Sequence, residues 1–112
     1  MVNRSKNRGT AWESAIVTYL VDQGWHYTER RSLSGAEDKG DIAGIPGVMI
    51  EAKATKAITL GSFIEEVTVE MRHAKARVGV AWIKRRGKGS PGDAYVVMTG
   101  RQFVYLLQKA GF

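Results

Sequence analysis

The order of apolar patterns between residues 48 and 84 constrains the fold of this chain more than any other feature. Residues 48–53 and 78–84 each have the pattern of a buried strand, and the second is almost continuously apolar, as expected for a strand covered on both faces. Between them, Ser62-Phe-Ile-Glu65 has the capping-box pattern of a helix that runs to about Arg77. A helix that crosses between two strands of a sheet places them parallel. The sequence therefore predicts an α/β fold.

The rest of the chain supplies the other elements of this fold. Thr10-Ala-Trp-Glu13 is a second capping box, which predicts a helix to about Gln23. Apolar and turn patterns predict strands over 25–31, 41–43 and 94–98, the last of them buried. They also predict a basic loop over 85–92 and a final helix over 99–109. The first three strands are joined by short turns and should form an antiparallel meander. We expect a mixed central sheet flanked by helices.

Length and composition narrow the class of protein. A chain of 112 residues predicts a single domain, with residues 1–9 as a flexible basic arm. The absence of cysteine excludes disulfides and thiolate metal sites. No apolar run approaches the roughly 18 residues of a membrane span, and the polar, basic start lacks the apolar stretch of a signal peptide, so we expect a cytoplasmic protein without a membrane partner.

Positive charge is in excess and clustered. Seventeen Lys and Arg residues against eleven acids give a net charge of +6 and a pI near 9.8. Such clusters suit a polyanion such as DNA, because each phosphate contact releases condensed counterions, but they also suit a solvated surface. The candidate DNA-binding residues are Arg4, Lys6, Arg8, Arg30, Arg31, Lys84, Arg85, Arg86 and Lys88. Gly87-Lys-Gly-Ser90 lacks the spacing and following helix of a phosphate loop, so no nucleotide cofactor is expected.

Two opposite charges, Glu51 and Lys53, interrupt the strand over 48–53. Side chains alternate across a strand, so these two share the face opposite Ile50, and Asp41 stands at the start of the preceding strand. Two carboxylates on a stiff hairpin suit Mg²⁺, with Mn²⁺ as a substitute, and Lys53 can neutralise charge on a phosphate. The carboxyls of Asp41 and Glu51 meet only if the hairpin has an odd loop or a bulge, and a regular hairpin would instead leave an exposed charged face.

Four short motifs, in order, resemble the Holliday junction resolvases of archaeal type, which belong to the PD-(D/E)XK nuclease superfamily. They are Arg8-Gly-Thr-Ala-Trp-Glu13, Arg30-Arg-Ser-Leu-Ser-Gly35, Gly40-Asp-Ile42 and Ile50-Glu-Ala-Lys53, and Gly40 stands where the superfamily's name has proline. The resemblance implies catalytic roles for Glu13, Asp41, Glu51, Lys53 and Ser34, with Ser34 positioning the phosphate. It implies Asp41, Glu51 and Glu13 as the metal ligands.

The resemblance predicts a metal-dependent endonuclease that cleaves four-way DNA junctions. Such an enzyme should be a homodimer, because two strands of opposite polarity need two sites related by a two-fold axis. Glu13 has a simpler alternative, which is to cap the helix that begins at Thr10. Two other functions stay open: a nuclease of the same fold with nicking, repair or restriction-like activity, and a basic DNA-binding module without catalysis.

Overall fold

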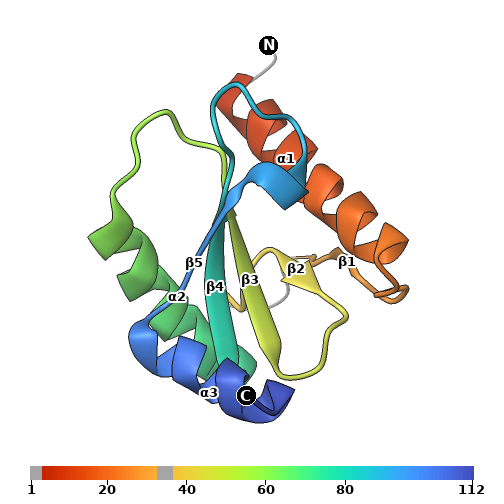
Figure 1. The fold of residues 1–112 in the computed structure, drawn as a ribbon. Helices are drawn as coiled ribbons and strands as arrows, with labels where there is room; N and C mark the ends of the chain where they lie inside the picture. Colours follow the sequence, from red (N-terminus) through yellow and green to blue (C-terminus); the bar gives the residue numbers. More distant parts are fainter. Residues whose placement is uncertain (1–3, 33–36) are drawn as a thin grey trace.

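The computed structural model describes residues 4–32 and 37–112. A five-stranded sheet with the order β1-β2-β3-β4-β5 lies between helices (Figure 1). The elements are α1 (Arg4–Asp22), β1 (Glu29–Arg30), β2 (Ile42–Ala43), β3 (Val48–Lys53), α2 (Leu60–Ala74), β4 (Val78–Ile83), the 3-10 turn η1 (Pro91–Asp93), β5 (Tyr95–Val97) and α3 (Gly100–Ala110). Within these described residues, no helix is both long and apolar enough to cross a membrane.

The strand pairing confirms the predicted mixed sheet. β1, β2 and β3 form an antiparallel meander, β4 adds parallel to β3 through the crossover helix α2, and β5 pairs antiparallel with β4. The single α/β domain expected from the order of apolar patterns is therefore confirmed.

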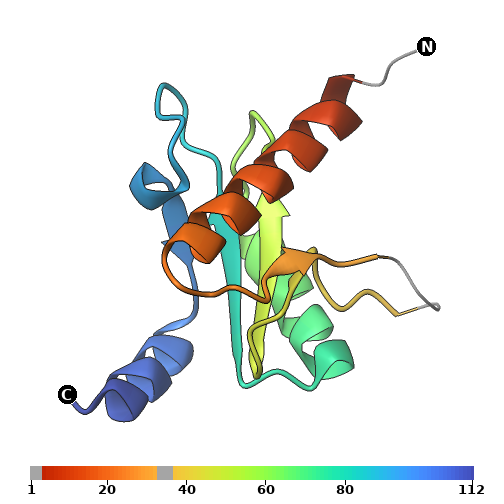
Figure 2. The ribbon, with the colours of Figure 1, turned by 90° about the vertical axis from the view of Figure 1, so that its right-hand side faces the viewer.

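Helices cover both faces of the sheet. α1 lies across one face and α2 lies behind the other (Figure 2). On the α1 side the core contains Trp12, Ile16, Leu20, Ile42, Ile50, Val78, Val80 and Trp82. On the α2 side it contains Met49, Phe63, Val67, Ala81 and Ile83. Since side chains alternate along β3, Glu51 and Lys53 share the α2 side with Met49.

The hairpin between β2 and β3 has the odd loop that is needed to place Asp41 and Glu51 on the same face of the sheet. Ile42 pairs with Ile50, so the same register places Asp41 level with Glu51 and leaves residues 45–47 as an odd loop. Gly44, at φ +105°, stands directly before this loop, and a Cβ there would lie 2.0 Å from the carbonyl oxygen of Tyr27. The hairpin therefore needs glycine at this position, and the predicted irregularity is confirmed.

Two helix starts differ from the prediction. α1 begins at Arg4, so residues 4–9, expected as an arm, form its first turns, and Thr10 and Glu13 lie inside the helix. α2 begins at Leu60 after the N-cap Thr59, not at Ser62, and it ends at Ala74 because Lys75 adopts the left-handed conformation at φ 52°. Both capping boxes were wrong as helix starts, since the helical pattern continues upstream of each.

The strands at the two ends of the sheet are shorter than predicted. β1 contains only Glu29 and Arg30 of the expected residues 25–31, and β5 spans Tyr95–Val97. β5 is an exposed edge strand and not a buried one, because its outer side has no neighbouring strand in the sheet. The cap of α3 is confirmed: the Thr99 hydroxyl accepts a hydrogen bond from the Gln102 amide at 3.2 Å.

Candidate active site

Asp41 and Glu51 lie side by side on neighbouring chain segments. The Asp41 amide donates to the Ile50 carbonyl oxygen at 2.9 Å, and Asp41 Oδ2 accepts a hydrogen bond from the Ala52 amide at 2.8 Å. These bonds on either side of Glu51 fix the Asp41 carboxyl against β3. Glu51 is only 5% exposed. The structure thus brings together the two carboxyls that the sequence placed on facing strands.

α2 and the loop before β2 add two further carboxyls. One carboxylate oxygen each from Asp38, Glu51 and Glu70 lie within 4.8 Å of one another. Glu70 projects from α2 and is 6% exposed, whereas Asp38 is exposed. Asp38 is held in place because its Oδ1 accepts from the Gly40 amide at 2.9 Å and its carbonyl oxygen accepts from His73 Nδ1 at 2.8 Å. We call Asp38, Asp41, Glu51 and Glu70 the acidic centre.

Burial and mutual repulsion favour protonation in this centre. Burial, together with Asp41 and Glu70, raises the pKa of Glu51 to about 12. Burial, with Asp38 and Asp41 close by, raises the pKa of Glu70 to about 6. Without a cation, the centre therefore holds at least one proton at neutral pH. A divalent cation would have to displace that proton to bind.

Lys53 lies beside the centre, on the same face of β3 as Glu51. Its Nζ forms an ion pair with Glu66 of α2 and sits 5.1 Å from the centroid of the Phe63 ring. Burial lowers the pKa of Lys53, but the hydrogen bond to Glu66 and the charge of Glu51 outweigh this and raise it overall. Lys53 is therefore positively charged and positioned next to the carboxyls, as the alternation of side chains along the strand predicted.

Glu13 reaches the edge of the site from the middle of α1. Its Oε2 pairs with Arg30 at 3.2 Å. Partial burial and the nearby Asp41 raise the pKa of Glu13, while Arg30 acts in the opposite direction. Glu13 therefore lies near both Asp41 and Arg30 of β1, and it does not cap α1 because it lies deep inside that helix.

A polar pocket of about 490 Å³ opens next to Asp41. Its lining contains Glu13, Arg30, Arg31, Ser32, Glu37, Asp38, Lys39, Gly40 and Asp41. The Arg31 amide donates to the Asp41 carbonyl oxygen at 2.7 Å, and Arg31 Nε is buried without a hydrogen-bond partner. Arg31 thus brings a positive charge to the lining of the pocket. Ser34, expected to position the phosphate, lies outside the described residues.

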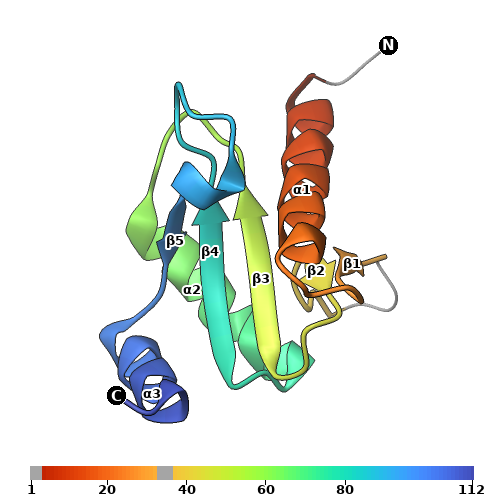
Figure 3. The ribbon, with the colours of Figure 1, turned by 45° about the vertical axis from the view of Figure 1, so that its right-hand side comes forward.

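A basic groove runs between the loops that follow β3 and β4, which extend beyond the same end of the sheet (Figure 3). The groove encloses about 460 Å³ and is lined by Ala54, Thr55, Lys56, Ile58, Lys84, Arg85, Arg86, Gly87, Lys88 and Gly89. It has five cationic side chains and no carboxylate. The Lys84 amide donates to the Lys53 carbonyl oxygen at 2.8 Å, so the groove begins where β3 ends.

The remaining predicted DNA-binding residues lie on α1. Arg4 and Lys6 belong to its first turns, and Arg8 follows them on the same helix with an exposed side chain. The residues expected to bind DNA are thus divided among α1, the lining of the polar pocket and the basic groove.

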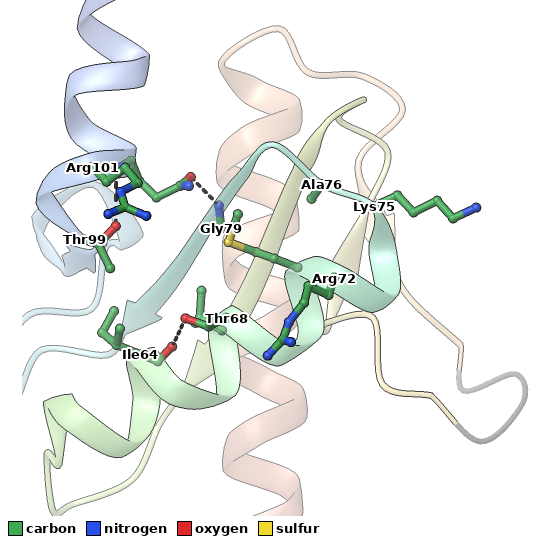
Figure 4. Close-up of a pocket in the computed structure, with 11 residues that line it drawn as sticks. Ile64, Thr68, Arg72, Lys75, Ala76, Gly79, Thr99 and Arg101 are labelled. Atoms are coloured by element: carbon green, nitrogen blue, oxygen red, sulfur yellow. Dashed lines mark hydrogen bonds between the residues drawn. The ribbon is translucent and has the colours of Figure 1, made fainter.

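A third pocket, of about 620 Å³, lies between α2, β4 and the start of α3 (Figure 4). Its floor includes Met71 and Gly79, and the Gly79 amide donates to Gln102 Oε1 at 3.2 Å. Its charged side chains are Arg72, Lys75 and Arg101. Because its lining contains no carboxylate, this pocket lacks the groups for metal-assisted hydrolysis.

Comparison with known proteins yields no match among protein-family models, curated proteins or solved structures.

Two members of the acidic centre, Glu70 and Asp38, were not predicted from the sequence. Glu70 had a detectable signal, because Phe63, Val67, Glu70 and Ala74 follow helical spacing and place a carboxyl on the apolar stripe of α2. Asp38 belongs to a second Glu-x-Lys pattern, Glu37-Asp-Lys39, in a polar loop. That loop offers no periodicity from which its approach to β3 could be predicted.

Proposed function

We propose that this protein is a divalent-cation-dependent DNA endonuclease. The observation that carries the proposal is the arrangement on β3, where Glu51 and Lys53 share one face and meet carboxyls from the preceding loop and from α2. A binding module with structural acids would scatter its carboxyls over separate faces. The gathered acids favour an enzyme.

The carboxyl oxygens of the acidic centre suit Mg²⁺ or Mn²⁺, which prefer hard oxygen ligands. A bound cation would neutralise phosphate charge and lower the pKa of water. In hydrolysis a water oxygen bonds to phosphorus, the P–O ester bond breaks, the water proton passes to a carboxylate and the leaving oxygen takes a proton from solvent. Lys53, on exchanging Glu66 for a phosphate oxygen, would stabilise the charge that develops there.

The distribution of cations supports DNA as the substrate. The basic groove carries five positive side chains, and the polar pocket adds Arg30 and Arg31 next to Asp41. Glu51 lies in β3 and Thr55 follows two residues after its end, so the four positions between them span at most roughly 13 Å. A phosphate backbone held in the groove would therefore pass close to the acidic centre.

The finer substrate follows from the resemblance to archaeal-type Holliday junction resolvases. On that basis we propose that the protein acts as a homodimer on four-way junctions in the cytoplasm. Nicking, repair or restriction-like cleavage by the same centre remains the alternative. A non-catalytic DNA-binding function would need the groove but not the acids.

Replacing Asp41 tests the enzymatic proposal. In Asp41→Asn the amide oxygen can still accept the hydrogen bond of Ala52, so the melting temperature should change little. The negative charge beside Glu51 is lost, which weakens the attraction of the acidic centre for a cation, so DNA cleavage in Mg²⁺ should fall by about tenfold or more. In metal-free buffer, DNA affinity should be unchanged or tighter, because one repulsive charge has been removed.

The matched control is Glu65→Gln, which removes an exposed carboxylate from α2. Cleavage, metal-free binding and melting should be measured on one preparation of each protein. A folded Asp41→Asn protein that cuts at nearly the wild-type rate would show that Asp41 has been assigned the wrong role.

A further inference from the structure

We propose that Asp38, Glu51 and Glu70 together bind one divalent cation, with Glu70 as a ligand from α2. This inference deepens the proposed function, because it names the cation site of the same centre. It also changes the ligand set expected from the sequence, which was Asp41, Glu51 and Glu13. In the structure, Glu13 is paired with Arg30, and the Asp41 carboxyl accepts a hydrogen bond from β3.

The three carboxyls of the proposed site lie close together. One oxygen from each of the three carboxyls lies within 4.8 Å of the other two, so a cation at their centre would lie within about 2.8 Å of all three, close to the usual ligand distances of about 2.0–2.6 Å. The ligands come from three different segments: the loop before β2, the middle of β3 and α2. The packing of α2 on β3 therefore sets their spacing.

One carboxyl oxygen of the proposed site is buried and has no hydrogen-bond partner among the described residues. Glu70 is 6% exposed, and its Oε2 is buried without any hydrogen-bond donor. A buried carboxylate oxygen that lacks a partner is costly and calls for a proton donor or a cation. Lys53, whose charge acts on both Glu51 and Glu70, has its Nζ paired with Glu66 instead.

The three carboxyls of the proposed site differ in their exposure to solvent. Glu51 and Glu70 are buried, whereas Asp38 is exposed at the rim of the polar pocket. A cation bound by these three residues would be enclosed by protein next to Glu51 and Glu70 and open to solvent next to Asp38. Mg²⁺ usually keeps several waters and takes substrate oxygens at such open positions. The open side faces the pocket next to Asp41, where the proposed phosphate would enter.

Calorimetric titration of Mn²⁺ into the metal-free protein, without DNA, tests the site. Wild type should bind one ion, and Glu70→Gln and Asp38→Asn should each weaken binding by about tenfold or more, since each loses a charged ligand. Glu65→Gln, on an exposed face of the same helix, should bind like wild type. Mg²⁺ should also raise the melting temperature of wild type and of Glu65→Gln, but not of Glu70→Gln.

Asp38→Asn keeps the test decisive if Glu70→Gln misfolds, because Asp38 lies on an exposed loop. Wild-type affinity in either variant would overturn the ligand set. A wild-type protein that binds no cation would also overturn it, and would mean that the buried carboxyls share only a proton. The titration contains no DNA, so it tests the cation site separately from the nuclease activity. A protein that binds Mn²⁺ but cuts no DNA would support the proposed cation site and contradict the proposed nuclease function.

Discussion

At the scale of single residues, Glu51 is the most strongly perturbed group of the centre. Its carboxyl is buried between the sheet and α2, next to Asp41 and Glu70, so ionisation there is opposed by desolvation and by like charge. Carboxyls with strongly shifted pKa values are more frequent at functional sites than elsewhere in proteins. Glu51 would gain most from a cation, which would offset both costs at once.

This perturbation predicts the pH dependence of stability in the metal-free protein. The pKa values of Glu51 and Glu70 are raised on folding, to about 12 and about 6, so the native state binds more protons than the unfolded state above about pH 4.5. Stability should therefore fall as pH rises from about 5 to 8, with a slope that approaches about 1.4 kcal/mol per pH unit for one extra proton.

Denaturant unfolding at several pH values in chelator measures this slope. The charged groups that face the pair are Asp38, Asp41, Lys53 and Glu66. Glu51→Gln removes the main titrating group and should flatten the profile. Stability that rises over this range in wild type would mean that the acids are not desolvated as the structure has them.

The sequence could predict part of this centre and not the rest. Glu51, Lys53 and Asp41 belong to one hairpin, so alternation along the strand and the loop length were enough to bring them together. Glu70 joins them only through the packing of α2 on β3, which is a contact between segments 19 positions apart in sequence. Helical spacing shows that Glu70 faces inward but does not show which strand residue it meets.

At the scale of elements, the loops that follow β3 and β4 leave the sheet at the same edge. The two strands are parallel neighbours, so their ends and their following loops meet at one edge of the sheet. This is why Lys56, far from the loop over 84–88 in sequence, lines the same groove. Lys56 was absent from the residues expected to bind DNA.

The groove predicts a salt effect on DNA binding. Replacing Arg86 and Lys88 together with Ala should weaken binding similarly for all sequences and flatten the salt dependence by about 0.9 units of log–log slope per lost phosphate contact. Arg72→Ala with Arg101→Ala removes the same charge from the pocket of Figure 4 and serves as the control. An unchanged slope in the Arg86 and Lys88 variant would reduce the groove to a solubilising surface.

Elements in the sheet centre were predictable, and their ends were less so. The crossover from β3 through α2 to β4 follows from apolar patterns that packing enforces on both faces. The starts of α1 and α2 were misplaced because a capping box inside a helix looks the same as one at its start. β5 was expected to be buried, but its apolar residues lie on an exposed edge.

At the scale of the whole molecule, the described chain contains one acidic centre and one basic groove at its side. Its extents of 48 × 33 × 30 Å suit contact with a short length of one DNA arm. Cutting two strands of opposite polarity needs a second centre, related to the first by a two-fold axis. The proposed junction activity therefore depends on a second copy of the chain.

Cleavage of a labelled four-way junction beside a linear duplex of matched sequence tests the central claim most directly. With Mg²⁺ the account predicts paired, symmetric cuts in the junction, survival of the duplex, and no cutting in chelator. Equal cutting of both substrates would support a nuclease but contradict its preference for junctions. No cation-dependent cutting of either substrate, by a protein that binds both, would contradict the account.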